Sequence, residues 1–262
     1  MLATRLLSAV ALIPIVALLV WQGGLFFLVL VAVAGGVALW EFYQMMRAGG
    51  FRPLAVVGAV AFALMLIGAN GVDRRLQAFA VVVLVLGGLL WELASPEAEG
   101  KLQGWALTTA GALYIGWPLA HAVELRGRPD GLWWVMIVLL ATWATDTGAY
   151  FAGRFFGHHP FSPQYSPKKT WEGVLGGWSL GLVVTALLAW WLLGLSPAGS
   201  FVLGLLLGPA AVYGDLAESM LKRRVGVKDS GSLIPGHGGL LDRLDSLLFT
   251  AVVTYYFALW FA

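Results

Sequence analysis

The chain has 262 residues, of which 60% are hydrophobic and only 11% are Asp, Glu, Lys or Arg. This composition lies far outside the range of soluble globular proteins and predicts an integral membrane protein. The absence of cysteine excludes disulfides, thiolate nucleophiles and cysteine-ligated metals, and the formal net charge of +2 is too small to suggest a nucleic-acid partner.

Apolar stretches follow one another along the whole chain, each close to the roughly 20 residues that a helix needs to cross the hydrocarbon core. They predict an all-α polytopic bundle of about nine transmembrane helices, near residues 6–22, 24–45, 54–71, 76–94, 104–125, 132–153, 174–195, 201–221 and 240–262. The first stretch is similar to a signal peptide because Arg5 precedes it. However, Trp21 and Gln22 stand where small cleavage-site residues are expected, so we interpret it as a retained span.

Lysine and arginine are distributed unequally between the two sides of such a bundle. The side of the N-terminus carries twelve of them, namely Arg5, Arg47, Arg52, Lys101, Arg154, Lys168, Lys169, Lys222, Arg223, Arg224, Lys228 and Arg243. The opposite side carries four, namely Arg74, Arg75, Arg126 and Arg128. The positive-inside rule then predicts a cytoplasmic N-terminus, an external C-terminus and two long polar loops, 154–173 and 222–241, on the cytoplasmic face.

Glycine recurs at every fourth position in or directly before two of the predicted spans, at Gly173, Gly177 and Gly181 and again at Gly204 and Gly208. Small residues at this spacing let neighbouring membrane helices approach closely. We therefore predict that these glycine faces serve helix packing. The sequence shows no convincing internal repeat, so the inverted-repeat architecture of many transporters has no support.

Acidic residues gather in four places, each at or near a predicted cytoplasmic helix end. They are Asp146, Glu172, the pair Asp215 and Glu218, and the pair Asp242 and Asp245. Residues three apart share a helix face, so each pair forms a doubly acidic surface. Carboxylates collected near a membrane are costly without a cation or a basic partner, which predicts a charged site. Alternatively, Asp242 and Asp245 only offset the positive N-terminal dipole of the last helix.

A glycine-rich turn precedes the last acidic pair. The backbone amides of Gly236, His237, Gly238 and Gly239 could converge on an anion, as in a nest or an open helix terminus. The basic residues before the turn are Lys222, Arg223, Arg224 and Lys228. Acids, cations and glycines together are the usual components of a nucleotide-triphosphate site, whereas a basic patch on anionic lipid would explain only the cations. The chain has no Walker P-loop motif, so such a site needs another scaffold.

Two spaced sets of residues form a longer pattern in these polar regions. The downstream set is Ser219, Lys222, Arg223, Lys228, Asp229, Pro235, His237, Gly238, Gly239, Asp242, Arg243 and Asp245. The upstream set is Asp146, Tyr150, Gly153, Arg154, Gly157, Ser166, Lys168, Lys169, Thr170, Glu172 and Gly173. Together they resemble the signature of the phosphatidate cytidylyltransferases, the CDP-diacylglycerol synthases. Residues 1–130 are similar to that family only in hydrophobic character and number of spans.

The resemblance implies an enzyme that transfers CMP from CTP to phosphatidate, giving CDP-diacylglycerol and pyrophosphate in phospholipid biosynthesis. A phosphate monoester is already anionic at neutral pH, so its attack on the α-phosphorus of CTP needs charge neutralisation and in-line positioning more than a strong base. A CTP-dependent lipid kinase, an ether-lipid cytidylyltransferase and a transporter are the alternatives. The full signature favours the phosphatidate enzyme, and a transporter would be expected to carry its charges near the membrane midplane.

The resemblance also implies roles for individual residues. It predicts Asp215 and Asp242 as ligands of a divalent metal, normally Mg²⁺, with a monovalent ion such as K⁺ as a further candidate. The expected catalytic residues are Asp215, Asp242, Asp245, Lys222 and His237. The expected substrate-binding residues are Ser166, Lys168, Lys169, Ser219, Arg223, Lys228, Asp229, Gly238, Gly239, Arg243 and Asp146. Three roles stay open for His237: a hydrogen-bond donor to a phosphate, a general acid to pyrophosphate, or a structural hydrogen-bonding residue.

The expected organisation follows from these roles. N-terminal transmembrane helices over residues 1–130 precede a catalytic transmembrane region over 131–262, which carries both cytoplasmic loops. The resemblance further implies a homodimer, and we expect a bacterial inner membrane as the location. The two substrates, CTP and phosphatidate, would reach the site from water and from the bilayer.

Overall fold

The structure, a computed structural model, describes residues 14–94, 101–231 and 238–261. The chain divides into two compact units, which we describe separately. Unit 1 comprises Met1–Gly127 and Arg224–Arg243, and unit 2 comprises Arg128–Arg223 and Leu244–Ala262. By this clustering, the described residues 224–231 and 238–243 group with the N-terminal helices.

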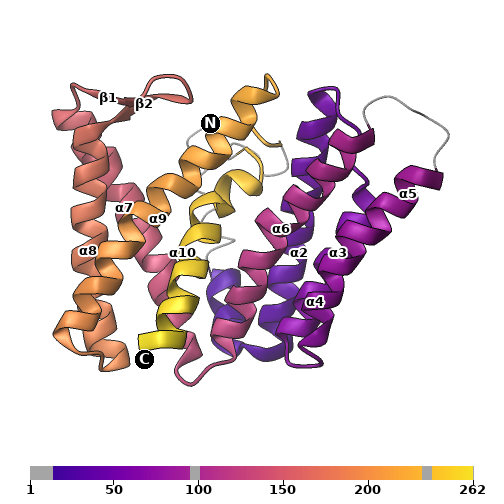
Figure 1. The fold of residues 1–262 in the computed structure, drawn as a ribbon. Coiled ribbons are helices and arrows are strands. Elements are labelled where there is room, and N and C mark those ends of the chain that lie inside the picture. Colours follow the sequence, from indigo (N-terminus) through magenta and orange to yellow (C-terminus); the bar gives the residue numbers. More distant parts are fainter. Residues whose placement is uncertain (1–13, 95–100, 232–237, 262) are drawn as a thin grey trace. The chain divides into compact units, whose positions relative to one another are not determined.

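Unit 1 is built from apolar helices, drawn in indigo to magenta in Figure 1. Residues 14–22 are helical, and this is the described part of the predicted span near 6–22. The elements that follow are α2 (Gly24–Ala48), α3 (Ala55–Ala69), α4 (Arg75–Val82), the π-helix η1 (Val83–Gly87), α5 (Gly88–Ala94) and α6 (Lys101–Arg126). Helix α6 packs against both α2 and α3, so these three helices form the core of the unit.

An arginine fastens the first described helix to the end of α6. The helix is interrupted at Gly23, whose φ is 70°, between residues 14–22 and α2. Arg126 donates from Nε to the carbonyl oxygen of Val20 and from Nη2 to that of Trp21, both at 2.8 Å. The last carbonyl groups of a helix have no partner within it, and the guanidinium supplies one.

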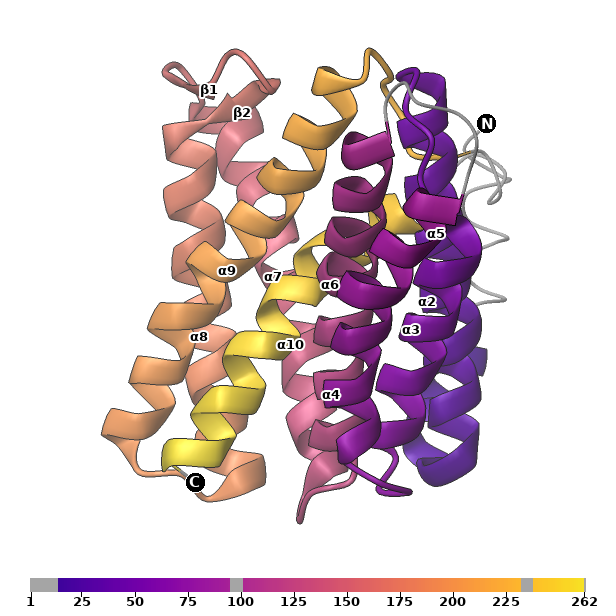
Figure 2. The same cartoon turned by 45° about the vertical axis from the view of Figure 1, so that its right-hand side comes forward.

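Unit 2 contains the helices α7 (Gly131–Phe156), α8 (Trp171–Leu193), α9 (Pro197–Arg224) and α10 (Leu241–Phe261), which run side by side in Figures 1 and 2. The last residue of α9 and the first three of α10 belong to unit 1 by clustering. The most extensive packing joins α7 to α8.

The predicted glycine faces lie at these helix contacts. A Cβ atom at Gly177 would lie 2.6 Å from the carbonyl oxygen of Thr145 in α7, and one at Gly173 would lie 3.0 Å from that of Ala149. A Cβ atom at Gly204 of α9 would lie 2.7 Å from the carbonyl oxygen of Leu182 in α8. Only glycine allows such close approach, so the packing prediction is confirmed.

A two-stranded hairpin joins α7 to α8, within the predicted loop 154–173. Strand β1 (Pro160–Ser162) pairs antiparallel with β2 (Ser166–Thr170), with Pro160 opposite Thr170. Thr170 then caps α8 by accepting a hydrogen bond from Gly173 N at 3.2 Å. The cap lets α8 begin at Trp171, so the helices reach further into this loop than expected and the connection is ordered as a hairpin.

The helices have the dimensions of a membrane protein. Within the described ranges, six stretches are long and apolar enough to cross a bilayer, namely Gly24–Ala48, Arg75–Ala94, Gly131–Phe156, Trp171–Leu193, Pro197–Arg224 and Leu241–Phe261. Large apolar side chains such as Trp191 and Leu205 are exposed on them, as expected where lipid replaces water. The predicted all-α polytopic membrane fold is therefore confirmed.

Candidate active site

An ion pair joins the two polar regions within unit 2. Strand β2 places Lys169 next to α9, where its Nζ lies 2.8 Å from Asp215 Oδ2. Ser219, one turn along α9, donates to Asp215 Oδ1 at 3.2 Å. Both oxygens of Asp215 therefore have partners, and three predicted site residues come together from a hairpin and a helix.

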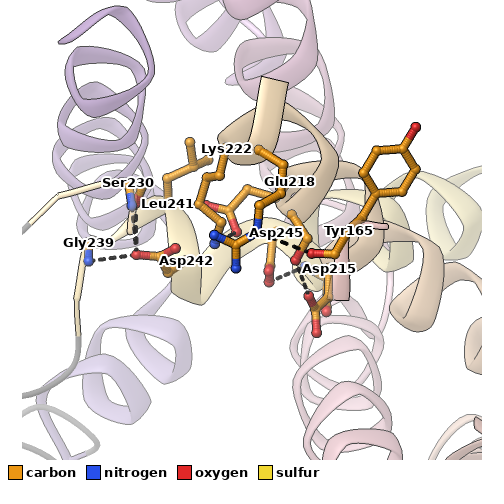
Figure 3. A network of polar contacts seen from close by, with 12 residues as sticks. Tyr165, Asp215, Glu218, Lys222, Ser230, Gly239, Leu241, Asp242 and Asp245 are labelled. Atoms are coloured by element: carbon orange, nitrogen blue, oxygen red, sulfur yellow. Dashed lines mark hydrogen bonds and ion pairs between the residues drawn. The ribbon is translucent and has the colours of Figure 1, made fainter. Parts of the chain in front are cut away.

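A second ion pair is buried one turn further along α9. Lys222 Nζ lies 2.6 Å from Glu218 Oε2, with the side chain of Glu218 fully buried and that of Lys222 12% exposed (Figure 3). Glu218 stood out in the sequence only as part of an acidic pair. Because a buried carboxylate needs a counter-charge, Glu218 holds the ammonium group of Lys222 beside the other acids.

Asp245 lies on α10 and faces this cluster. Its side chain is 8% exposed, and its Oδ1 accepts a hydrogen bond from Ser246 N at 2.6 Å. Asp215, Asp146 and Lys222 are its charged neighbours. By formal charge, the four acids Asp146, Asp215, Glu218 and Asp245 of unit 2 outnumber the two ammonium groups of Lys169 and Lys222.

A glycine allows α9 and α10 to meet beside Asp245. A Cβ atom at Gly214 would lie 2.6 Å from the carbonyl oxygen of Asp245 and 2.8 Å from Ser246 Cα. Ser246 also donates from Oγ to the carbonyl oxygen of Ala211 at 3.0 Å. The two helices are therefore locked together where their acidic residues lie.

The negative charge excess suits a cation without forming a complete metal cage. Among the residues that the structure describes, no group of three or more His, Cys, Asp or Glu side chains is arranged to hold a metal ion. Mg²⁺ is commonly bound through one or two carboxylates, with phosphate oxygens and water as its other ligands. Asp215 fits such a partial ligand set.

Other predicted residues of unit 2 lie around the hairpin. Arg223 Nε donates to the carbonyl oxygen of Tyr165 at 3.4 Å, while Ser166 begins β2 opposite Ser162. Lys168 is exposed, on the opposite face of the strand from Lys169. The hairpin therefore presents its two lysines in two different directions.

Glu172 serves the base of the hairpin and not the acidic cluster. Its Oε1 pairs with His159 Nδ1 at 2.5 Å, and its Oε2 accepts hydrogen bonds from the backbone N–H groups of His158 and His159 at 3.2 and 3.3 Å. The sequence offered no role for the two histidines. The structure places them in the connection that leads to β1.

Unit 1 holds the other part of the signature. Asp242 Oδ2 accepts three hydrogen bonds, from Ser230 N at 3.1 Å, Ser230 Oγ at 2.9 Å and Gly239 N at 2.8 Å (Figure 3). Gly238 has a φ of 78°, which favours glycine. Asp242 Oδ2 therefore connects Ser230, which precedes positions 232–237, to Gly239, which follows them. Gly236 and His237, two members of the predicted anion nest, lie outside the described residues.

Glu41 is a site residue that the sequence analysis missed. It lies on α2, is 1% exposed, and its Oε2 accepts a hydrogen bond from Leu241 N at 2.9 Å, with Ser230 Oγ at 3.4 Å as an alternative donor. The available signal was an acid within a predicted apolar span, toward its C-terminal end, which is a functional indication in itself.

The remaining predicted residues are exposed in unit 1. Lys228 and Asp229 lie in the connection after α9, and Arg243 lies in the first turn of α10. The proposed metal ligands Asp215 and Asp242 belong to different units. Their joint role as ligands therefore stays a prediction. Asp242 does lie in the first turn of α10, as the dipole interpretation requires.

Comparisons with known proteins agree with the signature. The profile of the cytidylyltransferase family matches residues 3–261. A phosphatidate cytidylyltransferase of Brucella suis is 36% identical over 270 residues, covering 100% of this chain and 94% of that protein. Those of Synechocystis and Mycobacterium bovis are both 34% identical, over 97% and 86% of this chain and 95% and 78% of their own lengths. The chain therefore belongs to the cytidylyltransferase family.

Proposed function

We propose that this protein transfers CMP from CTP to phosphatidate, producing CDP-diacylglycerol and pyrophosphate. The observation that carries the proposal is the contact of Asp215 with both Lys169 of the hairpin and Ser219 of α9, because it joins the two halves of the signature in one charged cluster. Relatives named for this activity match the chain over nearly its full length, which supports the same substrates here.

The chemistry is a displacement at phosphorus. An anionic phosphate oxygen of phosphatidate forms a bond to the α-phosphorus of CTP, the bond between that phosphorus and the α–β bridging oxygen breaks, and pyrophosphate leaves with the electron pair. Lys169 and Lys222 bind phosphate oxygens and offset charge repulsion as the two anions meet. Ser219 and Glu218 keep Asp215 and Lys222 in place through the contacts described above.

We propose Mg²⁺ as the cofactor, with Asp215 and Asp242 as its protein ligands and K⁺ as the candidate monovalent ion. When bound, Mg²⁺ would neutralise charge on the phosphate oxygens. The acidic excess around Asp215 supports this assignment because phosphates alone would be repelled there.

A membrane setting suits phosphatidate as the acceptor. Removing its acyl chains from the bilayer would cost about 0.8 kcal/mol for each CH₂ group, so the enzyme has to work where the headgroup lies. We further propose a bacterial inner membrane, a cytoplasmic site and N-terminus, an external C-terminus, and a homodimer. The charge bias of the loops supports the orientation.

The direct test of the reaction uses purified protein in phosphatidate-containing nanodiscs with Mg²⁺ and CTP labelled in its cytidine. We expect label in a lipid product together with one pyrophosphate for each product molecule. Diacylglycerol in place of phosphatidate is the matched control and should give neither. Product from diacylglycerol with release of CDP would identify a lipid kinase and refute the proposal.

Orientation can be tested in this cysteine-free chain with single cysteines at exposed positions. We expect Gln164→Cys, in the hairpin turn, to be shielded in intact cells from an impermeant thiol reagent. We expect Pro129→Cys, between α6 and α7, to react. The opposite labelling pattern would reverse the proposed orientation.

A further inference from the structure

Glu41 is buried against the segment that carries the end of the signature, although it lies some 200 positions earlier in the chain. Its Oε2 accepts a hydrogen bond from Leu241 N at 2.9 Å, across a sequence separation of 200 residues. Leu241 is the first residue of α10, and its N–H group is among those that a helix leaves unpaired at its start. Glu41 therefore fixes the start of α10 onto α2.

Ser230 connects Glu41 to Asp242. Its Oγ lies 2.9 Å from Asp242 Oδ2 and 3.4 Å from Glu41 Oε2. A hydroxyl has one proton, so it donates to one carboxylate at a time, and the shorter distance favours Asp242. Ser230 Oγ therefore lies within hydrogen-bond reach of both carboxylates and links the surroundings of Glu41 to those of Asp242.

Two glycines make this arrangement possible. A Cβ atom at Gly231 would lie 2.5 Å from Glu41 Oε1, and one at Gly239 would lie 2.7 Å from Glu41 Oε2. Gly239 is part of the signature and also donates to Asp242. These close approaches to a residue that is 1% exposed show that Gly231 and Gly239 pack directly against Glu41.

We propose that Glu41 is a positioning residue for the cytidylyl-transfer reaction. It holds Ser230 and the start of α10 so that Asp242 and the amides next to it keep the geometry that the reaction needs. Glu41 acts because its side chain is long enough for Oε2 to accept a hydrogen bond from Leu241 N. It does not contact the substrate itself. The kinetic part of this proposal rests on the proposed function, whereas the structural part does not.

Three substitutions of Glu41 separate the effect of its side-chain length from the effect of its negative charge. Glu41→Gln keeps the length and an acceptor oxygen but loses the charge, Glu41→Asp keeps the charge but is shorter by one methylene, and Glu41→Ala loses both. Tyr43→Phe is the matched control, because Tyr43 lies on the same helix, is also buried, and donates to the carbonyl oxygen of Thr108 at 2.9 Å, away from the segment.

The structural measurement is hydrogen exchange of the peptide that covers residues 238–246, in the purified membrane protein without substrate. We expect faster exchange at its first amides in Glu41→Ala and Glu41→Asp, and parental exchange in Glu41→Gln and Tyr43→Phe. Parental exchange in all four variants would show that Glu41 does not anchor α10, whatever reaction the protein catalyses.

The kinetic measurement is kcat and KM for CTP across a Mg²⁺ titration. We expect kcat to fall about tenfold or more in Glu41→Ala and Glu41→Asp, equivalent to ~1.4 kcal/mol on the barrier, with a higher half-activating Mg²⁺ concentration. Glu41→Gln should stay close to the parent. A parental kcat in Glu41→Ala, or rescue by Asp and not by Gln, would overturn the positioning role. Absence of product with the parent protein would refute the proposed function and leave the exchange result intact.

Discussion

The two units treat their carboxylates differently. In unit 1, Asp242 and Glu41 accept hydrogen bonds from backbone N–H groups and a serine hydroxyl. In unit 2, Asp215 and Glu218 pair with lysine ammonium groups. Neutral donors fix backbone in place, whereas an ammonium group can exchange a carboxylate for a phosphate. From this difference we expect unit 1 to shape the signature residues that it holds and unit 2 to supply the charges that respond to substrate.

The largest expected effect tests whether this division is complete. If Asp215 and Asp242 hold Mg²⁺, Asp215→Asn and Asp242→Asn each lose several kcal/mol of charge stabilisation, and about 4 kcal/mol corresponds to a roughly thousandfold slower reaction. Initial rates against Mg²⁺ concentration measure this. Asp73→Asn, an exposed acid before α4, is the control and should match the parent.

The Asp242→Asn result also distinguishes metal binding from the alternative role of Asp242 at the start of α10. If it only offsets the helix dipole and closes the loop, Asp242→Asn should cost about 0.3 to 1 kcal/mol of stability with activity largely kept. A near-parental rate and unchanged Mg²⁺ dependence in either variant would remove that residue from the metal assignment.

The next effect concerns the buried pair of unit 2. Lys222→Met leaves the fully buried Glu218 without its ammonium partner, which should lower the free energy of unfolding by about 3 kcal/mol. The double variant Glu218→Gln/Lys222→Met should recover most of that loss but not the activity. Thermal unfolding in detergent and initial rates measure the two effects. Recovery of both stability and activity would show that the pair is purely structural.

A smaller effect separates the two hairpin lysines. We expect Lys169→Ala to lower kcat/KM for CTP by about tenfold or more, equivalent to ~1.4 kcal/mol, because it removes the cation beside Asp215. Lys168→Ala should raise KM and lower kcat to a lesser degree, since its ammonium group is exposed and, unlike that of Lys169, makes no ion pair with a residue that the structure describes. Equal kcat/KM values for Lys168→Ala and the parent would take Lys168 out of the site.

The smallest effect tests the cap that positions the hairpin. Thr170→Ala should lower stability by about 1 kcal/mol, because Gly173 N loses its side-chain acceptor. Thr170→Ser keeps the hydroxyl and is the matched control. If both substitutions shift the unfolding temperature equally, the threonine methyl group and not the cap is responsible.

Much of the fold was predictable because the bilayer imposes it. Spans need a minimum length of apolar residues, and that length is visible in the sequence. The hairpin between Pro160 and Thr170 was not predictable from periodicity, since its strands are short and carry prolines. Helix α9 reaches Arg224 because polar residues continue a helix beyond the hydrocarbon core, where hydropathy no longer indicates it.

The candidate site was only partly predictable. The acids and cations on α9 were apparent from their spacing, but the pairing of Lys169 with Asp215 depends on how the hairpin folds back, which no local pattern encodes. Glu41 was overlooked because hydropathy averages one acid into an apolar span. Its partner at Leu241 is a backbone amide, which carries no signature in the sequence.

The bond between Glu41 and Leu241 also sets an order of events during synthesis. Glu41 leaves the ribosome 200 residues before its partner, which at about 5 to 20 residues per second is a wait of roughly 10 to 40 s. Through that interval α2 carries an acid into the membrane without the amide that will later bind it. The nascent chain therefore completes this region only after nearly all of its other helices have been made, so assembly of the signature segment is a late step of biogenesis.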